Sequence, residues 1–338
     1  MAYTAVLVGC GGICNAWLGP ISETDKLNII GLVDLNEDAA KAVQEKYDLS
    51  DAKVATDLDA LLTELSPDIV FDCTVPIAHK SVTLTALKHG CHVLGEKPLS
   101  DSMGNARETV EAANASGKTY AVIQNRRYMN QIRAVRKFIE SGKLGKVTTV
   151  NADFYMGCHF GGFRDEMDHV LLLDMAIHSF DQARLISGAN AESVYCQEWN
   201  PAESWYAHGA SAQCIFEMTD DIIFNYRGSW CAEGLHTSWE CDWRIIGTKG
   251  TLRWNGDDDI KAAIVQKVDG WQAETEEIQI DIEEVEEFTS HKGVIMNFLK
   301  CLEEGSEPET ICSDNIHSLA MVFGAVESAE KGSKVSIN

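Results

Sequence analysis

The sequence has few basic residues for its length. Its 338 residues include 28 Lys and Arg against 52 Asp and Glu, which gives a formal net charge of −24. Such a chain would repel a phosphate backbone, so we expect no nucleic-acid partner. Anionic membrane surfaces are disfavoured for the same reason, and no apolar run approaches the roughly 20 residues that span a bilayer. We therefore expect no membrane partner either.

The sequence also lacks the cysteine spacing of a disulfide or metal framework. It has 11 cysteines, an odd number, with no C-x-x-C pair. In a chain of this length that usage is typical of reduced thiols, most of them buried. The first residues, MAYTAVLVGCGG, contain no basic segment and lead directly into a glycine turn, unlike a secretory signal. Together these features predict a cytoplasmic protein.

Strand and helix patterns alternate through the first 125 residues. Continuous apolar runs, typical of strands buried on both faces, occur at 4–9, 27–34, 67–74, 92–96 and 119–124. Amphipathic stretches such as 36–48 and 103–117 separate them. This alternation indicates βαβ units and a parallel sheet, so we predict an α/β Rossmann domain over residues 1–125.

From residue 126 onward the pattern changes to longer segments, many with alternating polarity. Strand-like segments occur at 146–156, 193–199, 211–218, 222–230, 243–256 and 277–285. Helical stretches occur at 130–142, 170–188, 291–304 and 314–331. We predict an α+β domain over 126–338, built on a large, mostly antiparallel open sheet, with the last helix free to pack back on the first domain.

A glycine turn follows the first predicted strand. Gly9, Gly11 and Gly12 permit a tight turn and close approach to a pyrophosphate at a helix N-terminus. The third position of the G-x-G-x-x-G fingerprint is Cys14, and such a turn alone could be merely structural. Asp34, at the end of the second strand, is placed to bind the adenosine ribose hydroxyls. No arginine follows it to hold a 2′-phosphate, so NAD is expected rather than NADP.

Lys97 follows the short apolar strand at 92–96, in the stretch CHVLGEKPLS. A lysine there is costly unless a ligand at the strand end requires a positive charge. Three motifs then occur in order: the G-x-G-G turn at 9–12, HVLGEKP at 92–98 and LLLDMAIH at 171–178. This order resembles the glucose-fructose oxidoreductase/inositol 2-dehydrogenase (Gfo/Idh/MocA) family of sugar and cyclitol dehydrogenases, over essentially the whole chain.

The resemblance implies a catalytic set of Lys97, Asp174 and His178. The family often has a cis bond at the position between Lys97 and Pro98. Asp174 and His178 are four residues apart, so on one regular helix they would share a face. Histidine suits removal of a hydroxyl proton, and Lys97 would stabilise negative charge on the same oxygen, with Asp174 orienting the imidazole or binding a neighbouring hydroxyl.

The other predicted site residues form two sets. The predicted cofactor-binding residues are Gly9, Gly11, Gly12, Ile13, Asp34, Thr74, Pro76, His79, Glu96, Lys97 and Asn125. The predicted substrate-binding residues are Lys97, Tyr128, Arg164, His169, Asp174, His178, Trp230 and His236. Two departures from the family occur: Asp168, His169 and Val170 replace a common Gly-Gly-Gly, and VPIAH at 75–79 replaces the commoner T-P-N-x-x-H. The first departure adds polar side chains to the expected pocket, so the substrate can differ from those of better-known members; in the second, His79 keeps its distance to Glu96 and Pro76 lies one residue closer.

Several alternatives remain open at this point. His169, Asp174 and His178 could bind a metal with help from Asp168, although no metal is expected. Arg126 and Tyr128 could form structural contacts instead of binding a ligand, and Trp243 is expected in the core.

The expected activity is hydride transfer between NAD and a ring hydroxyl of a small polyhydroxylated substrate, a sugar or cyclitol. The rival functions are redox-neutral glycoside cleavage or epimerisation, and non-catalytic NAD-responsive binding. By analogy with the family, a homodimer or homotetramer through the C-terminal sheet is expected.

Overall fold

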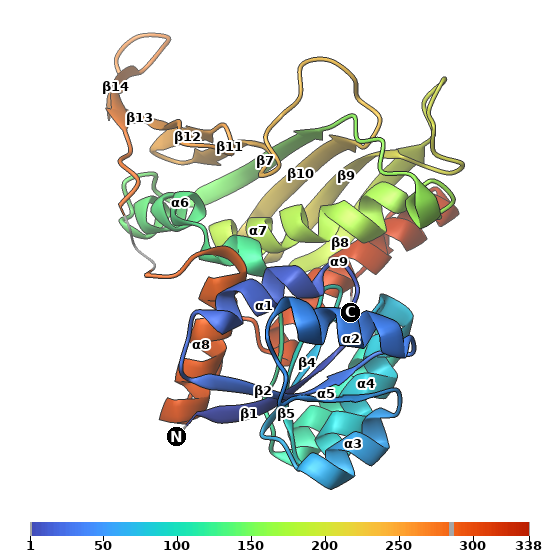
Figure 1. Ribbon diagram of the computed structural model, residues 1–338. Helices are drawn as coiled ribbons and strands as arrows, with labels where there is room; N and C mark the ends of the chain where they lie inside the picture. The colour runs from blue at the N-terminus through green and yellow to red at the C-terminus, as the bar shows by residue number, and fades with distance from the viewer. Residues whose placement is uncertain (1, 284–286, 338) are drawn as a thin grey trace. The chain divides into compact units, whose positions relative to one another are not determined.

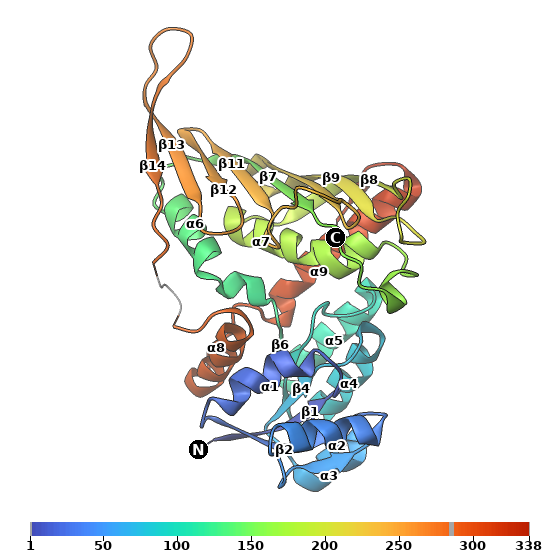
Figure 2. The same cartoon turned by 45° about the horizontal axis from the view of Figure 1, so that its top comes forward.

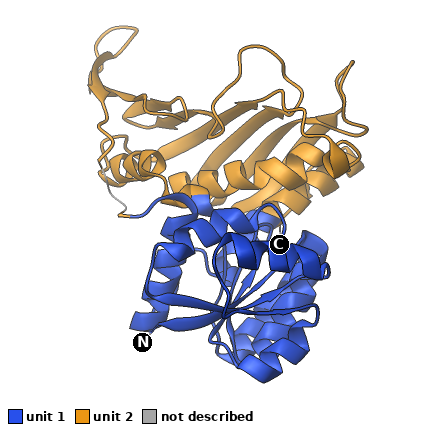
Figure 3. Ribbon diagram, viewed as in Figure 1, with its two compact units in different colours: residues 1–125, 288–319 blue, residues 126–287, 320–338 orange. Residues whose placement is uncertain are grey.

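The computed structural model describes residues 2–283 and 287–337, and it divides into two compact units (Figure 3). The first unit comprises residues 1–125 and 288–319, and the second comprises 126–287 and 320–338. The division falls within the last long helix, after Leu319. The predicted combination of a Rossmann fold with an α+β fold is confirmed.

A six-stranded parallel sheet forms the centre of the first unit (Figure 1). Its strand order is β3-β2-β1-β4-β5-β6, the order of a doubly wound dinucleotide-binding fold. The strands are β1 (Tyr3–Val8), β2 (Leu27–Val33), β3 (Lys53–Ala55), β4 (Ile69–Asp72), β5 (His92–Gly95) and β6 (Tyr120–Val122). The four residues of β4 are all buried, as expected for a strand covered on both faces.

Helices connect these strands and cover the sheet. They are α1 (Cys14–Ser22), α2 (Glu37–Lys46), α3 (Leu58–Leu65), α4 (Pro76–Lys88), α5 (Met103–Ser116) and, from the later segment, α8 (Ser290–Glu304). Side-chain caps fix three of the starts: Asn36, Asp57 and Ser102 each accept a hydrogen bond from a backbone N–H in the first turn. Because every connection runs from one parallel strand to the next, the carboxyl ends of the strands share one edge.

The second unit is built on a nine-stranded sheet of order β14-β13-β12-β11-β7-β10-β9-β8-β15 (Figure 2). All neighbouring pairs are antiparallel except β10 with β7. The strands are β7 (Val147–Tyr155), β8 (Ala191–Trp199), β9 (Ser211–Met218), β10 (Ile222–Ser229), β11 (Asp242–Gly247), β12 (Gly250–Trp254), β13 (Ile260–Lys267), β14 (Glu274–Gln279) and β15 (Val335–Ser336).

One face of this sheet is covered by helices, and the alternating burial along β9 reflects this. The helices are α6 (Asn130–Glu140), α7 (Ile177–Ser187) and the part of α9 (Cys312–Lys331) that belongs to this unit (Figure 2). Under α7, the rings of Phe180, Phe216, Phe224 and Tyr226 pack edge to face or stacked. The Ser328 hydroxyl joins α9 to β8 by accepting a 2.8 Å hydrogen bond from the Cys196 N–H.

Three sequence expectations need correction here. The segment 170–188 is not one regular helix: residues Leu171–Ala176 form a π-helical turn before α7 begins. The segment 243–256 is a hairpin of two strands, β11 and β12, rather than one strand. The strand expected at 277–285 is β14, which begins and ends earlier, and residues 284–286 lie outside the described residues. No helix among the described residues is long and apolar enough to cross a bilayer.

Candidate active site

The glycine turn between β1 and α1 is shaped for close approach. Gly9 has a φ of +92°, and a Cβ added there would lie 2.6 Å from the Cys73 carbonyl oxygen. A Cβ added at Gly11 or Gly12 would meet no described atom within 4 Å, so the space in front of α1 is open. Ile13, the residue before α1, provides no side-chain cap for the helix N-terminus. The turn therefore presents backbone N–H groups to an anion such as a pyrophosphate.

Asp34, which follows β2, is held beside this turn. Its Oδ2 accepts a 2.7 Å hydrogen bond from the Cys10 N–H, and its Oδ1 accepts a 2.8 Å bond from the Asn36 N–H. A carboxylate has about four acceptor positions, so two bonds leave capacity for hydroxyl donors. The side chain is thus fixed at the strand edge where the adenosine ribose of a dinucleotide would lie.

An apolar rim surrounds the same edge. Within the described part of the first unit, the exposed large hydrophobic residues are Ile13, Leu35, Val75 and Ile77. Each lies in or just after a connection that leaves the carboxyl end of a strand. Exposed apolar side chains gathered at one edge are typical of a ligand site. The turn, the carboxylate and this rim together fit a dinucleotide cofactor.

A buried polar cluster follows β4. Asp72, which is fully buried, accepts a 2.5 Å hydrogen bond from the Thr74 hydroxyl, and its Oδ2 lies 2.9 Å from Nδ1 of His79. Pro76 opens α4 at its first turn, which suits its lack of an N–H. The predicted residues Thr74 and His79 are therefore fixed by Asp72. Sequence reasoning missed Asp72, although an acid at the end of a buried parallel strand is a usable signal.

Glu96 anchors the backbone that carries Lys97. Its carboxylate is buried and accepts hydrogen bonds from Trp17 Nε1 at 2.8 Å and from the Lys97 N–H at 3.1 Å. His291 Nε2 lies 3.9 Å from the same carboxylate. Burial raises the pKa of Glu96, and the hydrogen bond from Trp17 and the Lys97 charge oppose that shift. The Lys97–Pro98 peptide bond is cis.

Trp17 and His291 were not found from the sequence, because nothing near them in the chain marks them as neighbours of Glu96. The predicted residue Asn125 has a comparable long-range contact: its Nδ2 donates to the Ser290 hydroxyl at 3.3 Å. The Trp17–Glu96 contact joins residues 79 apart in the chain, and the Asn125–Ser290 contact joins residues 165 apart. Only the folded chain reveals them.

In the second unit, Asp174 lies in the π-helical turn and forms a forked ion pair with Arg164. Arg164 Nε donates to Asp174 Oδ2 at 2.8 Å, and Nη2 donates to Oδ1 at 3.3 Å. His178 is half-buried in the first turn of α7. The π turn replaces the regular α-helical spacing at Asp174, and a shared face for Asp174 and His178 stays a prediction. Such π turns occur frequently at functional sites.

The ring nitrogens of His169 lie beside Glu198 and Glu330, whereas the alternative metal site would join it to Asp174 and His178. Its Nδ1 lies 2.5 Å from Glu198 Oε2, and its Nε2 lies 3.5 Å from Glu330 Oε1. The hydrogen bond to Glu198 raises the pKa of His169. Among the described residues, no group of three or more His, Cys, Asp or Glu could hold a metal ion. The alternative metal site at His169, Asp174 and His178 therefore has no support in the geometry.

The remaining predicted substrate residues differ in exposure. Tyr128 and Trp230 are each 2% exposed, whereas His236 lies on the surface. Trp230 packs edge to face against Phe154 and Phe160. Of the residues for which a structural role was the alternative, Trp243 is fully buried, as expected, and Arg126 pairs with Glu240 at 3.4 Å.

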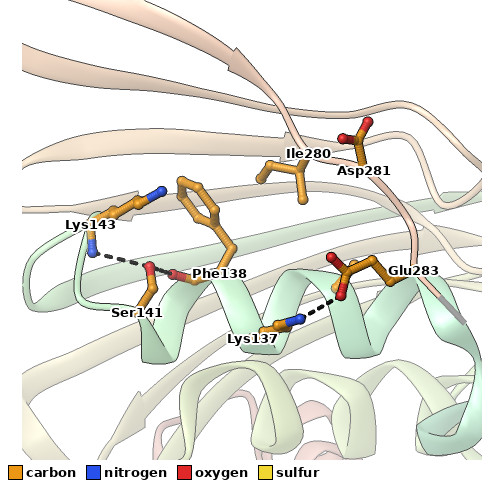
Figure 4. Close-up of a pocket in the computed structure, with 8 residues that line it drawn as sticks. Lys137, Phe138, Ser141, Lys143, Ile280, Asp281 and Glu283 are labelled. Carbon is orange, nitrogen blue, oxygen red and sulfur yellow. Dashed lines mark hydrogen bonds and ion pairs between the residues drawn. The ribbon is translucent and has the colours of Figure 1, made fainter. Parts of the chain in front are cut away.

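A hollow of about 250 Å³ lies elsewhere in the second unit, between α6 and the chain that follows β14 (Figure 4). Lys137 bonds to Glu283 at 2.5 Å across it, and the Lys143 ammonium lies over the Phe138 ring. None of the predicted site residues lines this hollow. The candidate residues lie in two separate places, at the strand edge of the first unit and around Asp174 in the second unit.

Comparison with known proteins gives the family. Residues 3–124 match the model described as "oxidoreductase family, NAD-binding Rossmann fold", and residues 132–253 match the "GFO/IDH/MocA C-terminal domain". The chain belongs to this family and is an NAD(P)-dependent dehydrogenase with NAD as its cofactor.

Three similar proteins cover nearly the whole chain. An uncharacterized protein, y4oX, of Sinorhizobium fredii is 24% identical over all of this chain and 96% of its own. The 1,5-anhydro-D-fructose reductase of Ensifer adhaerens is 24% identical over 98% of this chain and 97% of its own. A solved oxidoreductase from Agrobacterium radiobacter, in complex with NAD+, L-tartaric acid and magnesium, has a TM-score of 0.89. At 20% identity, over 100% of this chain and 99% of that one, the last shows a shared fold.

Replacing Asp34 by alanine tests the cofactor site. We expect the Kd for NAD to rise about tenfold or more, because the ribose hydroxyls lose a charged acceptor worth about 1.5–3 kcal/mol. Discrimination against NADP should fall as well, since the carboxylate no longer repels a 2′-phosphate. Titration calorimetry with both dinucleotides measures this. Asp57→Ala, which removes only the cap of α3, is the control, and an unchanged NAD affinity in Asp34→Ala would contradict the assignment.

Proposed function

We propose that this protein transfers a hydride between a ring hydroxyl of a sugar, sugar derivative or cyclitol and NAD. The single observation that carries the proposal is the order of three motifs in the sequence: the glycine turn at 9–12, HVLGEKP at 92–98 and LLLDMAIH at 171–178. The glycine turn leaves open space in front of α1, as a dinucleotide requires. The 1,5-anhydro-D-fructose reductase supports a sugar-like substrate, because it matches over nearly the full length.

The roles of the residues follow from their chemistry. The glycine turn and Asp34 would hold NAD, which would supply the hydride acceptor. His178 takes the hydroxyl proton, since an imidazole is the side chain best suited to proton transfer near neutral pH. The Lys97 ammonium stabilises the negative charge that develops on the same oxygen. Glu96 holds the Lys97 backbone N–H, and so acts as a positioning residue.

The ion pair with Arg164 affects how Asp174 can bind a substrate. The two Asp174 oxygens accept from the Arg164 guanidinium, and a carboxylate retains acceptor positions beyond those two bonds. In the proposed complex it accepts from a substrate hydroxyl next to the reacting carbon. The ion pair keeps the local charge balanced, which suits an uncharged polyol.

A substrate panel tests the proposal. Purified protein is incubated with NAD and, separately, monosaccharides, methyl glycosides and inositols, while NADH absorbance at 340 nm is followed. We expect stoichiometric NADH with at least one compound and a matching ketone by mass spectrometry. Glycoside cleavage without net NADH would replace the proposal by a redox-neutral reaction. No turnover of any of these compounds, or of the corresponding ketones with NADH, while the dinucleotide binds, would favour a non-catalytic binding protein.

We also propose a homodimer or homotetramer through the uncovered face of the nine-stranded sheet. Exposed Tyr195, Ile215 and Ile246 lie on β8, β9 and β11, at positions facing away from the buried residues of the same strands. Apolar side chains on an open sheet face are typical of an interface. Sedimentation velocity gives the mass in solution, and a monomer at micromolar concentration would contradict this assembly.

A further inference from the structure

A closed circuit of contacts passes through Asp174 in the second unit. Asp174 pairs with Arg164, whose guanidinium carbon lies 5.1 Å from the centre of the Phe160 ring. Phe160 packs edge to face on Trp230, which packs in the same way on Trp239.

Further contacts connect Trp239 to the π-helical turn that contains Asp174. The Trp239 carbonyl accepts a 2.5 Å hydrogen bond from Arg126 Nη1, and Arg126 Nη2 lies 3.5 Å from the Met175 sulfur. Met175 is next to Asp174 in the chain. Phe160 is therefore linked to the Asp174 carboxylate through Arg164, and the backbone at Trp239 is linked through Arg126 to the residue that follows Asp174.

Three aromatic side chains near Arg164 and Trp230 are exposed: Phe160 at 48%, Phe163 at 69% and Trp239 at 44%. Trp230, which is 2% exposed, packs edge to face against Phe160 and Trp239. Arg164 lies against Phe163 as well, 4.8 Å from the ring centre. Exposed aromatic residues held by a buried one form a surface that is already shaped before any ligand binds, which lowers the entropy cost of binding.

The charges around the circuit decide what this surface can bind. Arg164 faces Asp174, and Arg126 faces Glu240 at 3.4 Å. Both guanidinium groups are thus matched by a carboxylate. A phosphate or carboxylate on the ligand would have to displace one of them, whereas an uncharged ring would not.

We propose that Phe160, Phe163 and Trp239 form a subsite for an uncharged apolar group attached to the sugar, an aryl or cyclic aglycone. This inference rests on the proposed function and deepens it: the substrate class is a neutral glycoside rather than a free sugar or a sugar phosphate. The sugar hydroxyls bind at Asp174, and the aglycone packs against the exposed parts of the three aromatic side chains.

Matched substrates and variants test the subsite. The probes are glucose, methyl β-D-glucoside, phenyl β-D-glucoside and glucose 6-phosphate, with the same series on galactose. For wild type we expect kcat/KM for the phenyl glycoside to exceed that for the methyl glycoside about tenfold, mostly through KM. In Trp239→Ala and, separately, Phe163→Ala, this ratio should fall about two- to tenfold, the range given by an aromatic contact. The control is Trp271→Ala, on the hairpin between β13 and β14, where Trp271 is 96% exposed.

A binding measurement separates this inference from the proposed function. Calorimetric binding of phenyl glucoside that weakens in Trp239→Ala and Phe163→Ala, without any hydride transfer, would support the subsite and overturn the function. Hydride transfer with a phenyl-to-methyl ratio near one, or a ratio unaffected by both variants, would support the function and overturn the subsite. A preference for glucose 6-phosphate would overturn it too.

Discussion

Replacing Lys97 by alanine should lower kcat/KM for the substrate by about 10²- to 10³-fold. This is the loss measured when a hydrogen-bond donor to a developing oxyanion is removed, about 2.7–4 kcal/mol. The effect should be larger on kcat than on the Kd for NAD, because the ammonium acts on charge that develops in the transition state. Steady-state kinetics combined with NAD titration separates the two quantities.

Two further variants sharpen this test. Lys97→Arg keeps the positive charge but changes its shape, so we expect activity between that of the wild type and that of Lys97→Ala. Lys88→Ala removes a lysine whose side chain is 72% exposed and pairs with Asp59 at the surface. It should retain wild-type kinetics. If Lys97→Ala turned over within about threefold of wild type, Lys97 would have no catalytic role.

Replacing His178 by asparagine should lower kcat by about 10²- to 10⁴-fold, the usual contribution of a general base. Asparagine keeps a polar side chain of similar size but cannot accept the hydroxyl proton. A base must be unprotonated to act, so the wild-type rate should rise with pH along a limb that the variant lacks. Rates measured from pH 5 to pH 9 with a deuterated substrate show whether proton transfer or hydride transfer has become slower.

His208→Asn is the matched control for this histidine. His208 is half-exposed in the same unit and lies 3.2 Å from Asp168, so its loss should leave both the rate and the pH profile unchanged. A His178→Asn variant that kept the rising limb would assign that limb to another group. The proposed proton transfer would then be wrong, even if the rate fell.

Most of the first unit could be predicted because its signals are local. Each strand is a short apolar run, and each connection is an amphipathic helix or a glycine turn. The short strand β3 and helix α3 were not singled out, since three residues of strand carry almost no periodic signal. In the second unit the order of strands could not be predicted, because pairing such as β10 with β7 joins segments about 75 residues apart.

The π-helical turn at Leu171–Ala176 shows where local reasoning fails. The sequence LLLDMA has nothing in its apolar pattern that distinguishes a π turn from a regular one. In the folded chain, the turn contains Asp174 and Met175. Arg164 donates a hydrogen bond to Asp174, and Arg126 contacts the Met175 sulfur. Arg164 lies 10 residues before Asp174 and Arg126 lies 49 residues before Met175, and the spacing of apolar residues indicates neither contact.

The amino-acid sequence alone was enough for the parts of this protein that depend on consecutive residues: the alternating strands and helices, the glycine turn, Asp34 at a strand end and the motif that carries Lys97. Tertiary structure alone decided which side chains support them, namely Asp72 beneath His79, Trp17 and His291 around Glu96, and the aromatic circuit around Asp174. The physical reason is that turn and strand preferences act between neighbours in the chain. Hydrogen bonds and ring packing form between any groups that folding brings within a few ångströms.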